Sequence, residues 1–312
     1  MTALARDPGL LIVYPTHGTP THVWLQGRFI EDEHIKPARA SDNKLKNTWR
    51  TLRQLESDEI EGARIQVQVG TQTFTVVTDD DGVFQVEGDV AGAPLSPGPQ
   101  LVRAVALDDK GHHAPPGTGY VHILPAAPSV AVISDIDDTV VVSNITSKRK
   151  MIKTALTTNA AQMRATPGTA EALRRAVQAG AVGVFYLSGS PQNFLLRLQE
   201  FFQINGFPEG PVMLKNFGTD PTFDQTRYKT GRLETILAAH PQTRFVLVGD
   251  SGEHDPEIYR GLRDRFPGRI QGIFIREVPG GDNRPERFEG ITRVPDFSAQ
   301  PDLLARAVQP TP

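Results

Sequence analysis

Three aspartates, Asp135, Asp137 and Asp138, stand at the end of an apolar run, residues 130–134, that predicts a buried strand. Carboxylates crowded in this way repel one another and are costly to desolvate, so a hard divalent cation usually compensates them. Asp135 and Asp137 are two positions apart, which on an extended segment directs both side chains the same way. One carboxylate could attack phosphorus while the other transfers a proton and a metal ion holds the phosphate. An acidic turn that closes a strand is the alternative interpretation.

A second apolar run, residues 181–187, leads into Ser-Gly-Ser-Pro at 188–191, just before a helical pattern. The N–H groups at the start of a helix have no partner within the helix, and the helix dipole there favours negative charge. A serine at that place suits a phosphate oxygen. Ser188 is therefore a candidate phosphate ligand.

A third apolar run, residues 245–248, ends in a segment that contains Asp250, Glu253 and Asp255. Upstream of this run, Lys229 opens a helix-like pattern and could neutralise charge around a nucleophile. In an open parallel α/β sheet, the loops that follow different strands converge at the carboxyl edge. We therefore expect these segments to meet in one crevice.

The sequences of these segments resemble the motifs of a known superfamily. The pattern D-x-D-x-T at Asp135 to Thr139, the later Ser188 and Lys229, and the pair Gly249-Asp250 resemble the four motifs of the haloacid dehalogenase superfamily. Three longer motifs are similar to those of App1-type phosphatidate phosphatase catalytic domains: Ser-Asp-Ile-Asp-Asp-Thr, Tyr-Leu-Ser-Gly-Ser-Pro and Val-Gly-Asp-Ser-Gly-Glu-His-Asp. The resemblance covers roughly residues 131–278. It implies a doubly wound, Rossmann-like parallel sheet with a small cap insert.

The resemblance also implies roles for individual residues. Asp135 would be the nucleophile and Asp137 the general acid/base. Ser188 would bind phosphate, and Lys229 would be the lysine of the third motif. Asp135, Asp137 and Asp250 would hold Mg²⁺. Further candidates for contacts with the metal or the phosphate are Asp255, Glu253, Thr139, Ser190 and Lys215. Lys215, which follows a short apolar run, is the rival of Lys229.

Such a set of residues suits phosphomonoester hydrolysis. Attack by a carboxylate gives an aspartyl-phosphate that water later opens, which splits one difficult displacement into two. The charge on the transferring phosphoryl group requires a cation, a lysine and hydrogen-bond donors already in place. Phosphatidate is the substrate that the resemblance implies, and a sugar phosphate or a nucleic-acid end is the alternative. A noncatalytic adaptor with a vestigial catalytic fold is a third interpretation, against which the intact set of motifs argues.

A basic insert follows the first motif and runs to about residue 166. Its cationic residues are Lys148, Arg149, Lys150 and Lys153. They could attract a lipid-borne phosphate and bring the protein to an anionic membrane surface, at roughly 1 kcal/mol per basic residue. A solvated helix face is the alternative. Because so short an insert makes a poor lid, we expect an open site that accepts bulky or membrane-borne phosphomonoesters.

The first part of the chain predicts a different kind of domain. Short, often alternating runs, as in half-buried strands, occur at 23–28, 65–69, 73–77, 83–86, 101–106 and 120–124. The turn Thr78 to Gly82 predicts a hairpin, and Leu45, Trp49, Leu52 and Leu55 predict one amphipathic helix. The segments 91–99 and 112–119 read as loops. We expect an antiparallel, transthyretin-like β-sandwich at residues 1–127 and the catalytic domain at 128–312.

Composition sets the remaining limits. The chain has 312 residues, a net charge of −3 and no cysteine. The charge gives no indication of nucleic-acid binding, and the lack of cysteine excludes disulfides, thiol nucleophiles and thiolate metal sites. No apolar run approaches the roughly 20 residues of a membrane-spanning helix, and the N-terminus lacks the pattern of a signal peptide. We expect a cytoplasmic protein that associates at most peripherally with membranes.

Overall fold

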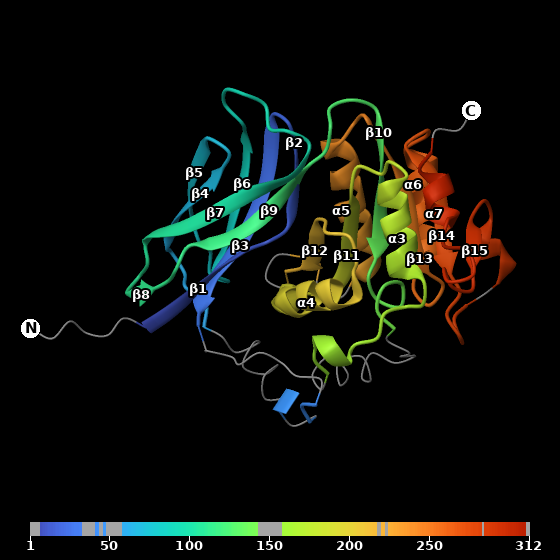
Figure 1. Cartoon of the computed structure of the whole chain (residues 1–312), viewed down its shortest axis with the longest axis horizontal. Helices are drawn as coiled ribbons and strands as arrows, with labels where there is room; N and C mark the ends of the chain where they lie inside the picture. Colours follow the sequence, from blue (N-terminus) through green and yellow to red (C-terminus); the bar gives the residue numbers. More distant parts are fainter. Residues whose placement is uncertain are drawn as a thin grey trace, which may run out of the picture. The chain divides into compact units, whose positions relative to one another are not determined.

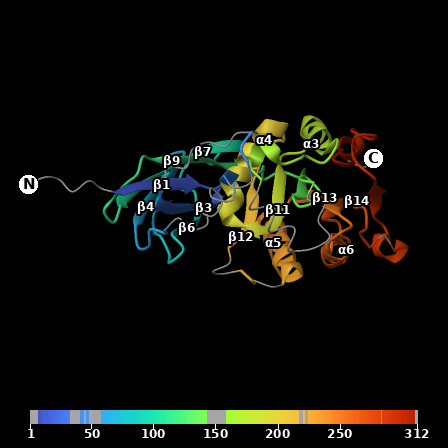
Figure 2. The same cartoon turned by 90° about the horizontal axis from the view of Figure 1, so that it is seen from below.

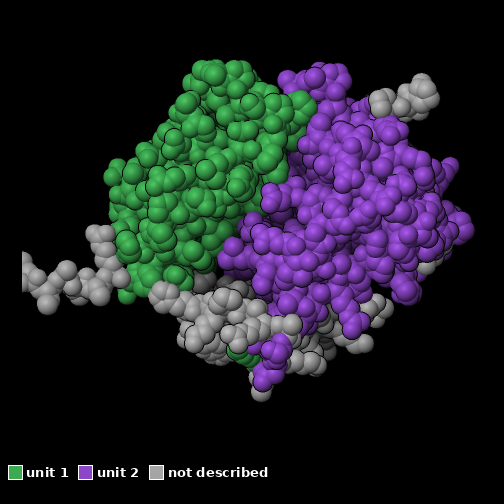
Figure 3. All heavy atoms as spheres, in the orientation of Figure 1, with its two compact units in different colours: residues 1–37, 45–125 green, residues 38–44, 126–312 purple. Residues whose placement is uncertain are grey.

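The computed structural model describes residues 7–32, 41–43, 46–47, 58–142, 158–216, 220–221, 224–282 and 284–309. The chain divides into two compact units, coloured separately in Figure 3. Unit 1 comprises residues 1–37 and 45–125, and unit 2 comprises residues 38–44 and 126–312. The four basic residues of the insert and the predicted helical stripe Leu45, Trp49, Leu52 and Leu55 lie outside the described residues.

Unit 1 is a β structure (Figure 1). Its strands are β1 (Asp7–Val13), β2 (Thr16–Thr19), β3 (His22–Glu31), β4 (Arg64–Val69), β5 (Gln72–Val77), β6 (Val83–Asp89), β7 (Gly98–Asp108), β8 (His112–His113) and β9 (Gly117–Ile123). They form a nine-stranded sheet in the order β5-β4-β7-β9-β2-β3-β1-β8, with β6 paired to β3. In β4, for example, Ile65, Val67 and Val69 are fully buried in the core while the residues between them are not. This alternation is the pattern from which the strand was predicted.

The sheet of unit 1 is mixed, which corrects the expectation of an antiparallel domain. Most neighbouring pairs are antiparallel, but β2 runs parallel to β9, and β1 runs parallel to β8. The chain returns from β2 to β9 by a long route through β3 to β8, and only such a crossover allows parallel pairing. The segment 112–119, expected to be a loop, supplies β8 and the beginning of β9.

The turn Thr78 to Gly82 does not close a hairpin, so that prediction was wrong. It connects β5 to β6, but β5 pairs with β4 and β6 pairs with β3. The Asp79 side chain accepts from the N–H groups of Asp81 and Val83, and Gly82 has φ +65°. These bonds fix a corner in the chain, and a corner with turn chemistry cannot be distinguished from a hairpin by its residues alone.

Unit 2 contains a six-stranded sheet in which every neighbouring pair is parallel. Its strands are β10 (Ser129–Asp135), β11 (Val184–Pro191), β12 (Val212–Lys215), β13 (Thr243–Asp250), β14 (Ile270–Arg276) and β15 (Thr292–Val294). The order is β12-β11-β10-β13-β14-β15, so the chain first moves outward from β10 in one direction and then returns to its other side. The predicted α/β architecture with a parallel sheet is confirmed.

Helices cover both faces of this sheet. They are α3 (Thr169–Gln178), α4 (Leu195–Asn205), α5 (Gln225–Ala239), α6 (Asp255–Arg265) and the short α7 (Leu303–Ala307), with 3₁₀ turns η1 (Ala160–Gln162), η2 (Gln192–Phe194) and η3 (Pro285–Phe288). Figure 2 shows α3 and α4 on one face and α5 and α6 on the other. Because both faces are covered, the central strands are apolar throughout: residues 245–248 of β13 are fully buried. No described helix is long and apolar enough to cross a membrane.

Candidate active site

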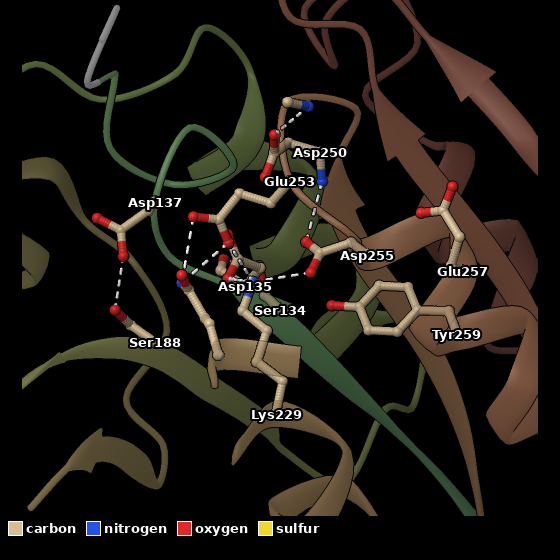
Figure 4. A network of polar contacts seen from close by, with 12 residues as sticks. Ser134, Asp135, Asp137, Ser188, Lys229, Asp250, Glu253, Asp255, Glu257 and Tyr259 are labelled. Carbon is tan, nitrogen blue, oxygen red and sulfur yellow. Dashed lines mark hydrogen bonds and ion pairs between the residues drawn. The ribbon is translucent and has the colours of Figure 1, made fainter. Parts of the chain in front are cut away.

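The carboxyl edge of the parallel sheet brings together side chains from four segments of the chain. Asp135 is the last residue of β10, and Asp250 is the last residue of the neighbouring β13. Ser188 lies in β11 on the other side of β10, and Asp255 is the first residue of α6. Lys229 reaches the same place from the second turn of α5 (Figure 4). The topology therefore assembles the predicted crevice.

Lys229 is the centre of this group. Its Nζ atom lies 2.6 Å from Asp135 Oδ1, 2.7 Å from Asp255 Oδ1 and 2.9 Å from Glu253 Oε2. Burial alone would lower the pKa of Lys229, but the three carboxylates together outweigh it and raise this pKa well above its usual value. The lysine is therefore a permanent cation beside Asp135.

Three buried aspartates next to Lys229 could hold a metal ion. One carboxylate oxygen from each of Asp135, Asp250 and Asp255 lies within 4.8 Å of the others. Burial raises the pKa of all three, and their proximity to other acids adds to the effect for each of them, while Lys229 opposes it. Ionising all of them would leave several negative charges around one lysine. Such an excess favours an additional cation.

The hydrogen bonds of these aspartates indicate which oxygens are available. Asp255 accepts from Lys229 at Oδ1 and from the Asp250 N–H at Oδ2, over 3.2 Å. By contrast, Oδ2 of Asp135 and Oδ2 of Asp250 are buried and accept no hydrogen bond from the described residues. Two orphaned carboxylate oxygens are the hard donors that Mg²⁺ prefers. The residues therefore fit a divalent cation held by Asp135 and Asp250, with Asp255 as a third acid beside it.

Asp137 occupies a different part of the site. Ser188 Oγ donates to Asp137 Oδ2 over 2.6 Å, and Ser190 Oγ lies 3.4 Å from the same oxygen. Figure 4 shows Asp137 beside Ser188 and apart from the three metal-site aspartates. Asp135 and Asp137 were expected to point the same way, but β10 ends at Asp135, so the alternation of an extended strand does not continue to Asp137. Burial raises the pKa of Asp137, although the Ser188 hydrogen bond opposes the shift.

A tight turn after β10 holds these residues in place. Asp138 has φ +56°, a left-handed conformation that is uncommon outside glycine. Its carbonyl oxygen accepts from Arg276, which lies at the end of β14 and is 9% exposed. Thr139 is fully buried, and its carbonyl oxygen accepts from the Thr169 hydroxyl at the start of α3. Thr139 therefore supports the turn rather than contacting the three metal-site aspartates.

The structure distinguishes the two candidate lysines. Lys215 ends β12 and is buried, with its Nζ atom 5.4 Å from the centre of the Tyr228 ring. Lys229 is the lysine that contacts Asp135. Glu253 and Asp255, predicted as additional acids, both accept from Lys229.

Gln225 is a site residue that the sequence reasoning missed. Its Nε2 atom lies 3.1 Å from both carboxylate oxygens of Glu253. A Cβ atom added to Gly189 would lie only 2.9 Å from the same nitrogen, so a larger residue at position 189 would displace the Gln225 side chain. Gln225 precedes Lys229 by four residues, which places both on one face of α5. That spacing is the signal that could have identified it.

A pocket of about 610 Å³ opens beside the polar group. It is lined by Asp224, Gln225, Thr226, Lys229, Gly252, Glu253, His254 and Ile258. These residues come from the start of α5, from the loop between β13 and α6, and from the first turn of α6. His254 therefore borders the pocket.

Known proteins are similar to the part of the chain that contains this site. Residues 130–277 match the family described as phosphatidate phosphatase APP1, catalytic domain. The phosphatidate phosphatase APP1 of Saccharomyces cerevisiae is 26% identical over 298 residues, which cover 92% of this chain and 48% of that protein. An uncharacterised Schizosaccharomyces pombe protein is 29% identical over 66% of this chain and 34% of its own length.

The chain thus spans about half or less of the length of these relatives. The family match confirms the predicted resemblance, and it includes Asp135, Ser188, Lys229 and Asp250. Residues 130–277 of this chain are therefore similar to the phosphatidate phosphatase APP1 catalytic domain.

Proposed function

We propose that this protein is a phosphomonoester phosphatase that acts through an aspartyl-phosphate on Asp135. The observation that carries the proposal is the contact of Asp135 with Lys229, next to orphaned carboxylate oxygens of Asp135 and Asp250. The Lys229 cation opposes the effect of burial on the pKa of Asp135 and so favours the ionised form, which is the form that attacks. This arrangement favours catalysis over a vestigial fold, because ionised groups are costly to bury without a function or a partner.

Asp137 is proposed as the general acid/base. A leaving alkoxide needs a proton, and the water that opens the intermediate must lose one. Burial raises the pKa of Asp137, so this carboxyl group keeps its proton at a higher pH than a free aspartate does, as a general acid must. Ser188, which is buried in β11, donates to Asp137 and can therefore orient this carboxylate, and we also propose it as the phosphate ligand.

Mg²⁺ is the cofactor that we propose for the acidic group. Asp135 and Asp250 would hold it through their orphaned oxygens, with Asp255 beside them and Asp137 as a further candidate. When bound, the ion would neutralise charge on the phosphate and on the carboxylates around it. Lys229 would still hold Asp135, Glu253 and Asp255 in position.

Phosphatidate or a related lipid phosphate is the proposed substrate. The printed name of the Saccharomyces cerevisiae relative supports this choice. Peripheral binding to a membrane in the cytoplasm would follow from a lipid-borne substrate. We also propose that unit 2 is haloacid dehalogenase-like and that unit 1 is a sandwich-like accessory domain. The order of the parallel strands, with its reversal at β10, supports the first assignment.

A phosphate-release screen tests the proposal. The purified protein would be incubated with Mg²⁺ and with phosphatidate vesicles, glycerol phosphate, a sugar phosphate and a 5′-phosphorylated oligonucleotide. We expect release from phosphatidate, loss of release with EDTA, and no release by Asp135→Asn. Release from a different substrate would keep the chemistry and change the substrate class. No release from any substrate, or full activity in EDTA, would contradict the proposal.

A further inference from the structure

The loop between β13 and α6, residues 251–254, is held by a residue outside the family match. Arg287 lies in η3, ten positions beyond residue 277 where the match ends. Its side chain is 8% exposed and lies against the backbone of this loop. The part of the chain after β14 therefore contributes to the candidate active site.

Every N–H group of the Arg287 guanidinium has an acceptor. Nη1 donates to the carbonyl oxygens of Ser251, over 2.9 Å, and Asp282. Nη2 donates to the carbonyl oxygen of Glu253 over 2.6 Å and to Glu257 Oε2 over 2.9 Å, and Nε donates to Glu257 Oε1. A guanidinium has five N–H groups in a fixed plane. Four of them join η3 to the loop and to α6, and the fifth binds Asp282, which precedes η3.

The loop in turn determines how the metal-site carboxylates lie. The Gly252 N–H donates to Asp250 Oδ1 over 2.6 Å, which leaves Oδ2 of Asp250 as the orphaned oxygen. The Ser251 N–H donates to the Arg276 carbonyl oxygen. Glu253, on the same loop, accepts from Lys229. A displaced loop would therefore turn Asp250 and withdraw Glu253.

We propose that Arg287 is a positioning residue that holds the 251–254 loop and thereby orients Asp250 for metal binding and Glu253 for Lys229. The inference rests on the proposed function, because it takes Asp250 as a metal ligand. Residues that orient metal ligands typically affect metal affinity or activity by about 10- to 100-fold.

Arg287→Lys is the informative variant. Lysine keeps the positive charge beside Glu257, but its three donors radiate from one nitrogen and cannot reach acceptors on three segments. Arg284→Lys is the matched control, because the Arg284 side chain is 73% exposed and pairs with Asp282. Both changes are conservative and lie in or next to the same 3₁₀ turn.

Two measurements on the full chain separate positioning from a loss of folding. Amide hydrogen exchange of Asp250, Ser251 and Gly252 reports on the loop, with the amides of Leu247 and Val248 in β13 as the reference. Mg²⁺ titration calorimetry reports on the metal site. For Arg287→Lys we expect faster exchange in the loop, unchanged exchange in β13, and Mg²⁺ affinity lowered about tenfold or more. Arg284→Lys should match the wild type in both.

Each outcome has a defined meaning. Wild-type exchange in the loop of Arg287→Lys would overturn the inference, and so would a loosened loop with unchanged Mg²⁺ affinity. If the wild type binds no Mg²⁺, the metal assignment of the proposed function fails, while the exchange comparison still decides whether Arg287 holds the loop. If Arg287→Lys does not fold, Glu257→Gln takes its place. It weakens the same anchor at a carboxylate that is 47% exposed and should loosen the loop to a smaller extent.

Discussion

Lys229 Nζ lies 2.6 Å from Asp135 Oδ1, and each of these side chains is 1% exposed. The proposed nucleophile thus rests against a buried cation. Removing one member of a buried ion pair leaves the other charge buried and unpaired. This usually costs more stability than replacing both members with apolar residues. Catalysis and stability should therefore respond together to changes at this pair.

Asp135→Asn should abolish phosphate release, because an amide cannot form the covalent intermediate. Asp137→Asn should lower kcat by about 10²- to 10⁴-fold, the usual contribution of a general acid/base, and leave Mg²⁺ binding largely intact. Steady-state kinetics and calorimetry on the purified variants measure both effects. Asp264→Asn, at a side chain 66% exposed on α6, is the control and should be fully active. Turnover by Asp135→Asn within about tenfold of the wild type would rule out the nucleophile assignment.

Lys229→Met should destabilise the metal-free protein by about 3–5 kcal/mol, because Asp135, Glu253 and Asp255 lose their common cation. Urea unfolding measures the change. Lys110→Met is the control, because it removes an ion pair with Asp108 in which the side chains are 45% and 43% exposed. The loss of stability there should be below about 1 kcal/mol. Asp135→Asn combined with Lys229→Met should recover part of the loss, and a strictly additive double variant would argue against coupling.

His240 should make unit 2 sensitive to acid. Burial, with a smaller effect of Arg269, lowers the pKa of His240 from 6.5 to about 4. His240 is harder to protonate in the folded state than in the unfolded state. Between pH 6.5 and about 4 the unfolded state therefore binds more protons. Stability is therefore present above pH 6.5 and lost as pH falls towards 4. The free energy of unfolding falls by about 3 kcal/mol over this range, because each unit of the pKa difference contributes roughly 1.4 kcal/mol.

Urea unfolding followed by circular dichroism at several pH values tests this. His240→Gln should flatten the dependence on pH, whatever its effect on stability at neutral pH. His113→Gln is the control, since His113 is exposed in β8. An unchanged slope in His240→Gln would contradict the prediction.

Gly189→Ala should impair the site with little effect on folding. The new methyl group would lie 2.9 Å from Gln225 Nε2, the end of a flexible side chain, so Gln225 would move away from Glu253. We expect a lower kcat and a melting temperature close to that of the wild type. Gly183→Ala, where the methyl group meets nothing within 4 Å, is the control. In a Gln225→Ala background, Gly189→Ala should have no further effect on kcat.

The basic insert gives a prediction about membranes that stands on sequence alone. Neutralising Lys148, Arg149, Lys150 and Lys153 together should lower kcat/KM on phosphatidate vesicles and weaken binding to anionic vesicles. Turnover of a small soluble phosphomonoester should hardly change. The difference should shrink with added salt, because charges are screened over roughly 8 Å at 0.15 M ionic strength. Equal losses on both substrates would indicate a structural role or general phosphate binding, and no loss would indicate a solvated helix face.

Much of the parallel sheet and its site could be predicted because local patterns determine them. The runs that became β10, β11 and β13 are apolar throughout, as strands covered on both faces must be. Since Asp135, Ser188 and Asp250 stand at or near the carboxyl ends of these runs, they could be assigned to one edge of the sheet.

The rest depends on contacts that no local pattern encodes. Arg287 donates to residues 30 to 36 positions away, and nothing in the residues around it indicates those partners. The direction of Asp137 depends on where β10 stops, and strand ends are difficult to predict to a single residue. The pairing of β6 with β3 rather than β5 likewise follows from the whole sheet of unit 1.

The position of β10 in the middle of its sheet also governs when the protein can become active. β10 pairs with β11 on one side and β13 on the other, and Ser129 and Thr243, which hydrogen bond between β10 and β13, are 114 positions apart. Contacts so distant in the chain form slowly, because a large loop must close before they stabilise anything. During synthesis, Asp135 emerges long before Asp250 and Asp255. A nascent chain would therefore carry the proposed nucleophile without the proposed metal site, and the proposed phosphatase chemistry would begin only after most of unit 2 has been made and folded.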